Sequence, residues 1–135
     1  MTIVDASVAT AWYVRIATSD AALPVRNRPF LAAPEFLKVE LTSSLLKYVR
    51  VGLLEPSAIR HAQSQIRTLV EIWVPDERLL TVATETARSN NHKIYDCLYL
   101  ALALERREPL ATADRRLAAL AAKLSIETHL IEPAL

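Results

Sequence analysis

The segment TIVDASVATAW, residues 2–12, contains the pattern that decides the fold. Two β-branched apolar residues, Ile3 and Val4, run directly into Asp5, and small residues with helical spacing follow at once. β-Branched residues favour strands, whereas Asp is favoured at the start of a helix. The segment is therefore predicted to form a short buried strand over residues 2–5 that leads into a helix over residues 6–15.

The alternation of short apolar strands with helices continues to the end of the chain. Further strands are predicted at residues 30–33, 72–74, 110–112 and 128–131. Helices are predicted at residues 35–51, 56–70, 77–89, 94–107 and 114–123, with a less regular helix at 19–28 that Pro24 limits. Gly52 and Asn91 are predicted to end two of these helices in a left-handed conformation. This order predicts an α/β fold with a central parallel sheet, in a single domain over residues 1–135.

The composition excludes several classes of protein. Apolar residues make up 52% of the 135, enough for a sizeable core. No apolar run reaches the roughly 20 residues of a membrane span, and the N-terminus lacks the features of a signal peptide, so a soluble, cytoplasmic protein is expected. Gly52 is the single glycine, which argues against Gly-rich phosphate loops, dinucleotide fingerprints and nucleophile elbows.

Cysteine and histidine give little support to a soft-metal site. The single cysteine, Cys97, rules out an internal disulfide and a cysteine-cluster metal site. The three histidines, His61, His92 and His129, are widely separated, so a zinc site is poorly supported. They also lie outside the acidic motifs described next, and none is assigned a catalytic role.

Four acidic residues stand out by their positions. Asp5 ends the first predicted strand and Asp114 follows the fourth, so both are expected at the carboxyl edge of the sheet, where α/β sites form. Asp96 lies in the first turns of a very apolar helix, in KIYDCLYLALA. Glu40 lies within the long helix after the second strand, in EFLKVELTSSLL.

Each acid taken alone also has a structural interpretation. Asp5 and Asp114 can cap helices, Asp96 can offset a helix dipole, and Glu40 can pair with Lys47. The four together favour a functional interpretation, because converging buried carboxylates are costly unless a cation neutralises them. Carboxylates are the ligands that Mg²⁺ and Mn²⁺ prefer.

The motifs around these acids resemble those of a known family. VDAS at 4–7, VEL at 39–41, YDCLYLALA at 95–103 and TAD at 112–114 together resemble the PIN-domain ribonucleases. The small size is similar to that of the VapC toxins of toxin–antitoxin pairs, and the resemblance spans residues 3 to about 131. It implies a three-layer α/β/α fold with a parallel sheet of about five strands.

The resemblance also implies an activity and a set of site residues. The chain is expected to be a Mg²⁺- or Mn²⁺-dependent endoribonuclease acting on RNA, to dimerise with itself, and to be inhibited by a VapB-like antitoxin. Asp5, Glu40, Asp96 and Asp114 would hold one or two ions, with Asp5 and Asp96 as the foremost direct ligands. Thr112 would orient an acid or a water, and Ser7 matches a small hydroxyl after the first acid.

Three departures from the family pattern concern loops rather than the acids. Asn91 stands where the family often has Gly, and Lys93 stands where a small capping hydroxyl is common. The segment around Pro24 is also unusual. These departures leave loop geometry and the choice of RNA target open.

The remaining charges are compatible with an RNA partner. With the four acids set aside, 11 of the 15 acidic residues remain against 16 basic ones. Arg15, Arg115 and Arg116 are close in sequence to the predicted site and are candidates for binding the RNA backbone, although for each one alone an ordinary solvated arginine is the favoured interpretation. Tyr95 and Tyr99 can stack on bases, but the apolar helix around them favours core positions.

Other classes of protein that place acids at strand ends fit less well. A receiver-like phosphorylation module needs adjacent acids after the first strand and a late lysine, and the chain has neither. A dehalogenase-type phosphatase needs a second acid two residues after Asp5, where Ser7 stands. A non-catalytic RNA- or protein-binding module on the same fold remains the alternative to an enzyme.

Overall fold

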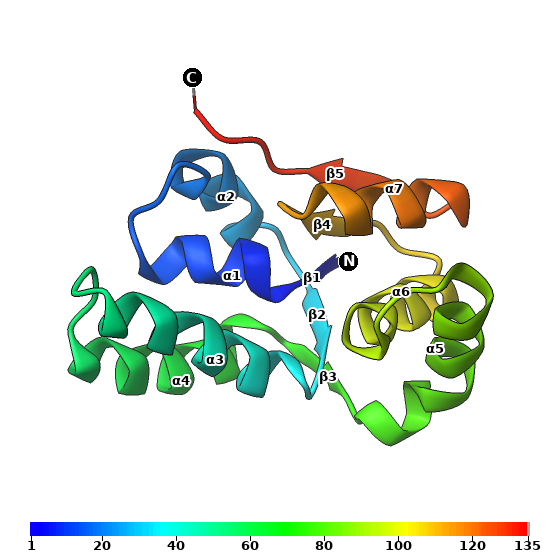
Figure 1. Cartoon of the computed structure of the whole chain (residues 1–135), viewed down its shortest axis with the longest axis horizontal. Coiled ribbons are helices and arrows are strands. Elements are labelled where there is room, and N and C mark those ends of the chain that lie inside the picture. The colour runs from blue at the N-terminus through cyan, green and yellow to red at the C-terminus, as the bar shows by residue number, and fades with distance from the viewer. Residues whose placement is uncertain (135) are drawn as a thin grey trace.

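The computed structural model describes residues 1–134, which contain five strands and seven helices (Figure 1). The strands are β1 (Thr2–Val4), β2 (Leu31–Pro34), β3 (Ile72–Val74), β4 (Leu110–Thr112) and β5 (Thr128–Leu130). The helices are α1 (Ala6–Tyr13), α2 (Ser19–Arg26), α3 (Leu37–Arg50), α4 (Pro56–Leu69), α5 (Asp76–Asn90), α6 (Ile94–Arg106) and α7 (Arg115–Lys123). The predicted alternation of strands and helices is confirmed.

The five strands form one parallel sheet in the order β3-β2-β1-β4-β5. The first strand is central: Ile3 pairs with Ala32 of β2 on one side and with Leu110 of β4 on the other. The chain builds outward from β1 in both directions, so the strand order reverses there. Crevices at the carboxyl ends of strands beside such a reversal are where α/β folds place their sites.

Helices cover both faces of the sheet and complete a three-layer α/β/α fold. Figure 1 shows α1 to α4 on one side of the strands and α5 and α6 on the other. The most deeply buried helix is α6, which packs against β1, β2 and β4 and has an unbroken buried run from Asp96 to Ala103. This run confirms the prediction of a helix buried on most sides, and it makes Asp96 a carboxylate set into the core.

Two prolines lie at or near the ends of their elements. Pro24 is exposed and lies inside α2, which ends two residues later at Arg26, short of the predicted residue 28. Pro34 is the last residue of β2, opposite Val74, so the strand ends one residue beyond the predicted range of 30–33. The strand also begins one residue later than predicted, because Phe30 has a positive φ of 57°.

Left-handed residues end several of the helices. Asn91, with φ 48°, follows α5, and Gly52, with φ 78°, follows the cap of α3, as the sequence predicted. The exposed Arg107 adopts the same conformation at the end of α6, with φ 54°. A side chain with a Cβ is strained there, whereas glycine is not.

We therefore expect Arg107→Gly to raise the free energy of unfolding by about 0.5–1 kcal/mol. The matched control is Ala119→Gly, at an exposed position inside α7, which should lower it by about 1 kcal/mol. Urea titration of both variants provides the comparison. Equal destabilisation by the two glycines would show that Arg107 is not strained.

Within residues 1–134, every helix is too short or too polar to cross a lipid bilayer.

Candidate functional site

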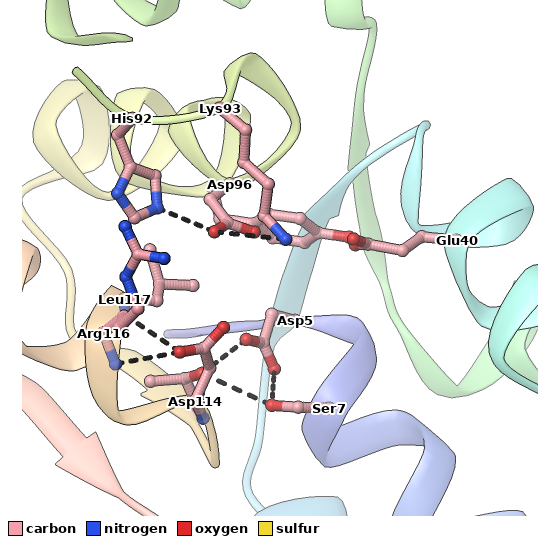
Figure 2. Close-up of polar contacts among 11 residues, drawn as sticks. Asp5, Ser7, Glu40, His92, Lys93, Asp96, Asp114, Arg116 and Leu117 are labelled. Carbon is pink, nitrogen blue, oxygen red and sulfur yellow. Dashed lines mark hydrogen bonds and ion pairs between the residues drawn. The ribbon is translucent and has the colours of Figure 1, made fainter.

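Four helices present their N-terminal ends at the carboxyl edge of the sheet, and each carries one of the four acids. Asp5 caps α1 and Asp114 caps α7, while Glu40 and Asp96 lie in the first turns of α3 and α6. Figure 2 shows the four side chains facing a shared space from these different elements. The positive ends of the helix dipoles partly offset the charge of the carboxylates.

Asp5 is the most tightly held of the four acids. It is only 4% exposed, and its Oδ1 accepts hydrogen bonds from the Ser7 hydroxyl at 2.6 Å and the Val8 amide at 3.1 Å. Its Oδ2 accepts a hydrogen bond from the Thr112 hydroxyl. Burial raises the pKa of Asp5 from 3.8 to about 6, even though these hydrogen bonds lower it. Asp5 thus has both interpretations considered from the sequence, as a helix cap and as a member of the acid group.

Two hydroxyls tie the end of β1 to the end of β4. Thr112, besides donating to Asp5, accepts the Asp114 amide at 3.0 Å. Ser7 accepts the Ala113 amide at 2.8 Å while its own proton goes to Asp5. Thr112 of the motif TAD therefore contacts both Asp5 and the backbone of Asp114.

Asp114 is fixed by the helix that it caps. Its Oδ1 accepts the amides of Arg116 at 2.9 Å and Leu117 at 3.1 Å. The structural interpretation of this acid is thus also correct, and its second oxygen is free of that capping role.

Glu40 is held from the opposite side of the site. Its Oε1 accepts a hydrogen bond from the Tyr99 hydroxyl at 2.7 Å, rather than pairing with Lys47 as one interpretation of the sequence proposed. Burial is the main cause that raises the pKa of Glu40, with the neighbouring Asp96 and Asp114 contributing. Tyr99 is fully buried, so the prediction of a core position is correct, but its hydroxyl also orients an acid of the site.

Asp96 has a partner that the sequence analysis set aside. His92 Nε2 lies 2.8 Å from Asp96 Oδ2, and the side chains of both residues are less than a tenth exposed. The exposed Lys93 places its Nζ 3.9 Å from the same oxygen. Both contacts are made by Oδ2 of Asp96. The sequence analysis gave His92 no catalytic role and did not foresee this contact with Asp96. The spacing of four residues between His92 and Asp96 was the signal available in the sequence.

A pocket of about 160 Å³ lies between α6 and α7. It is lined by His92, Lys93, Asp96, Asp114 and Arg116. Carboxylates and cationic side chains therefore share one small cavity, a combination suited to holding a cation and an anionic ligand side by side. Of the three arginines proposed for RNA, Arg116 is the one that lines this pocket.

Arg15 and Tyr95 do not lie where the sequence placed them. Arg15 follows the far end of α1, where its guanidinium pairs with Asp20 at 2.7 Å, because α1 runs away from the acids that lie at its start. Tyr95 is 52% exposed instead of buried, since it precedes the buried run of α6. Its ring stacks on Phe36, with centroids 5.1 Å apart.

The four acids are neighbours, but they do not form a ready-made coordination shell. Among residues 1–134, no three carboxylate, imidazole or thiol groups are gathered closely enough to hold one ion together. The acids are instead hydrogen-bonded to hydroxyls, amides and an imidazole of the protein.

Comparison with known proteins agrees with this arrangement. A family model described as PIN domain matches residues 2–123. The chain belongs to the PIN domain family. No curated protein sequence matches this PIN domain.

Solved structures share the fold of this PIN domain. PAE2754 from Pyrobaculum aerophilum is 25% identical, with a TM-score of 0.62 over 88% of this chain and 78% of that one. VapC20 from Mycobacterium tuberculosis, described as a toxin that cleaves the sarcin-ricin loop, is 18% identical, with a TM-score of 0.70 over 88% and 94%. A toxin–antitoxin complex from Klebsiella pneumoniae is 16% identical, with a TM-score of 0.63 over 88% and 91%.

Proposed function

We propose that this PIN domain is a metal-dependent endoribonuclease that hydrolyses RNA phosphodiester bonds. The observation that carries the proposal is the placement of Asp5, Glu40, Asp96 and Asp114 at four helix N-termini, with their side chains facing a shared space (Figure 2). A group of carboxylates repels a phosphodiester, so such a site needs a cation to act on one. Membership of the PIN domain family also supports a nuclease function.

The donor chemistry of the site fits Mg²⁺ or Mn²⁺. All four candidate ligands offer carboxylate oxygens, which these hard cations prefer. Burial raises the pKa of Asp5 and Glu40 because a buried negative charge is unfavourable, and a bound cation would offset that charge. Asp5 and Asp96 would be the main ligands, with Glu40 and Asp114 completing the site through side-chain movement. When bound, the cation lowers the pKa of water and stabilises charge on the phosphodiester.

The protein's own residues would hold and orient the reactants. Ser7 and Thr112 fix the carboxylate of Asp5, and Tyr99 fixes that of Glu40. Arg116 and Lys93, which line the small pocket beside Asp96, would attract the phosphate groups of the RNA. No serine, cysteine or histidine nucleophile is required.

We further propose that the protein is the toxin of a toxin–antitoxin pair, with a VapB-like antitoxin as its partner and a homodimer as its assembly. Support comes from the toxin and the toxin–antitoxin complex that share its fold. The surface also offers a protein partner a groove of about 540 Å³ between α3 and α4. Its lining includes the exposed side chains of Val39 and Leu46.

Incubation of the purified protein with total cellular RNA tests the activity. We expect discrete fragments with Mn²⁺, and none with EDTA or with Asp96→Asn. Asp20→Asn is the matched control, since it removes the same charge at an exposed position that pairs with Arg15 far from the acids. If the wild-type protein binds RNA but does not cut it at any Mn²⁺ concentration, the result would favour a non-catalytic binding module instead.

The contact between His92 and Asp96 predicts an effect on metal affinity. We expect His92→Leu to weaken Mn²⁺ binding by roughly 10–100-fold, because the carboxylate of Asp96 loses the group that orients it. His92→Gln, which can place an amide N–H near Asp96 Oδ2, should retain most of the affinity. Isothermal titration of Mn²⁺ into each variant measures the effect. Equal losses for Leu and Gln would show that the imidazole acts in some way other than as a hydrogen-bond partner.

A further inference from the structure

A second cavity opens beside the acids on the other side of Glu40. It measures about 510 Å³ and runs along α3, with Ser7 and Glu40 at one end and Lys47 among its other lining residues. Ser7 is the residue that donates to Asp5, so the cavity begins where the proposed reaction takes place. We call this cavity the α3 groove.

Two aromatic rings line the α3 groove near the acids. Phe36 and Tyr95 come from segments nearly 60 residues apart in the chain, and their planes are within 10° of parallel. Phe36 covers one face of the Tyr95 ring, yet Tyr95 is still 52% exposed. The pair therefore presents an aromatic surface that is still accessible to a ligand. This surface lies close to the acids, because Tyr95 directly precedes Asp96.

The rest of the lining favours a nucleic acid over an apolar peptide. Val39 is the only large aliphatic residue in the groove, whereas Ser43, Ser44 and Lys47 are polar or charged. Lys47 follows Glu40 by two turns of α3, or about 10 Å, and offers a cation to a phosphate next to the one at the acids. Along α3, Phe36 of the aromatic pair lies one turn before Glu40 and Lys47 lies two turns after it. An aromatic surface and a lysine on either side of an acid site suit an RNA strand, in which a base stacks on the rings while neighbouring phosphates meet the charges.

We propose that Phe36 and Tyr95 form a stacking subsite for one unpaired nucleobase of the RNA substrate, with Lys47 on a neighbouring phosphate. The proposal rests on the ribonuclease function proposed above and narrows its substrate class. A paired base is stacked on both faces inside a helix and cannot lie on this surface, so the RNA must be single-stranded at the cleavage site.

Fluorescence of 2-aminopurine, which stacking on an aromatic ring quenches, tests the subsite directly. The probe is a short single-stranded RNA with 2-aminopurine at its centre, titrated with wild-type protein and Mn²⁺. We expect quenching, and a loss of at least about tenfold in affinity with Tyr95→Leu. Tyr95→Phe keeps the ring and should restore binding. Phe30→Leu, at another exposed aromatic residue on the amino side of β2, should have no effect.

The outcomes separate the subsite from the proposed activity. The subsite alone would be overturned if the protein binds and cuts RNA without quenching 2-aminopurine. The same conclusion would follow if Tyr95→Leu binds and cuts RNA as well as the wild-type protein does. A Tyr95→Leu protein that handles RNA normally but escapes inhibition by its co-expressed antitoxin would assign the surface to the antitoxin, against the proposal. RNA that wild type neither binds nor cuts would overturn both proposals. Thermal melting of each variant confirms that a loss of binding is not a loss of folding.

Discussion

Asp5→Asn is expected to lower the rate of RNA cleavage by about a thousandfold or more, while making the metal-free protein more stable. The rate should fall because one of the two proposed main ligands of the cation is lost. The stability should rise because a buried charge is removed at neutral pH. The amide of Asn can still cap α1 and face the Ser7 and Thr112 hydroxyls, so the local structure has no reason to change.

The expected gain in stability follows from the raised pKa of Asp5. A shift from 3.8 to about 6 corresponds to a cost on the order of 3 kcal/mol for carrying the charge at pH 7.5. Urea titration in EDTA measures the gain, and single-turnover cleavage with Mn²⁺ measures the loss of rate. Asp20→Asn serves as the control and should change neither value appreciably. A variant at Asp5 that is inactive because it is less stable would contradict this explanation.

Mn²⁺ should stabilise the protein much more at pH 7.5 than at pH 5. Because the pKa of Asp5 is raised in the folded protein, the metal-free protein binds more protons than the unfolded chain between about pH 4 and 6. The contribution that protonated Asp5 makes to the stability of the metal-free protein is therefore full below the unfolded pKa and is lost as the pH rises through about 6. The raised pKa of Glu40 acts in the same direction.

Cation binding reverses this trend, because protons and metal compete for the same carboxylates. We expect the affinity for Mn²⁺ to fall by up to about tenfold for each pH unit below 6. Melting temperatures with Mn²⁺ and with EDTA, measured from pH 5 to pH 8, give the comparison. The increment due to Mn²⁺ should shrink at low pH in wild type and be nearly absent at every pH in Asp5→Asn. An increment independent of pH would place the cation away from Asp5.

Much of the fold could be predicted from local patterns. Strands of three or four apolar residues between helices indicated the parallel sheet, and β3 and β4 were predicted with their observed bounds. The prolines indicated the ends of elements only to within one or two residues. The helix α2 continues for two residues past Pro24, and β2 includes Pro34 as its last residue. Near the last turn of a helix or at the end of a short strand, the loss of one N–H is tolerated.

The positions of the four candidate acids could be predicted, whereas their hydrogen-bond partners could not. Asp5 and Asp114 follow strands, and position relative to a strand end is readable from the sequence. Tyr99 meets Glu40 from a helix 59 residues away, a contact that depends on how α6 packs against the rest of the fold. His92 was overlooked because it was judged by its distance from other histidines rather than by its spacing from Asp96.

Anomalous diffraction from crystals soaked in Mn²⁺ tests the four-acid centre most directly. A manganese peak within coordination distance of both Asp5 and Asp96, absent from crystals of Asp96→Asn, is the predicted result. Manganese bound elsewhere, or no peak at a concentration of Mn²⁺ that supports cleavage of RNA, would contradict the account.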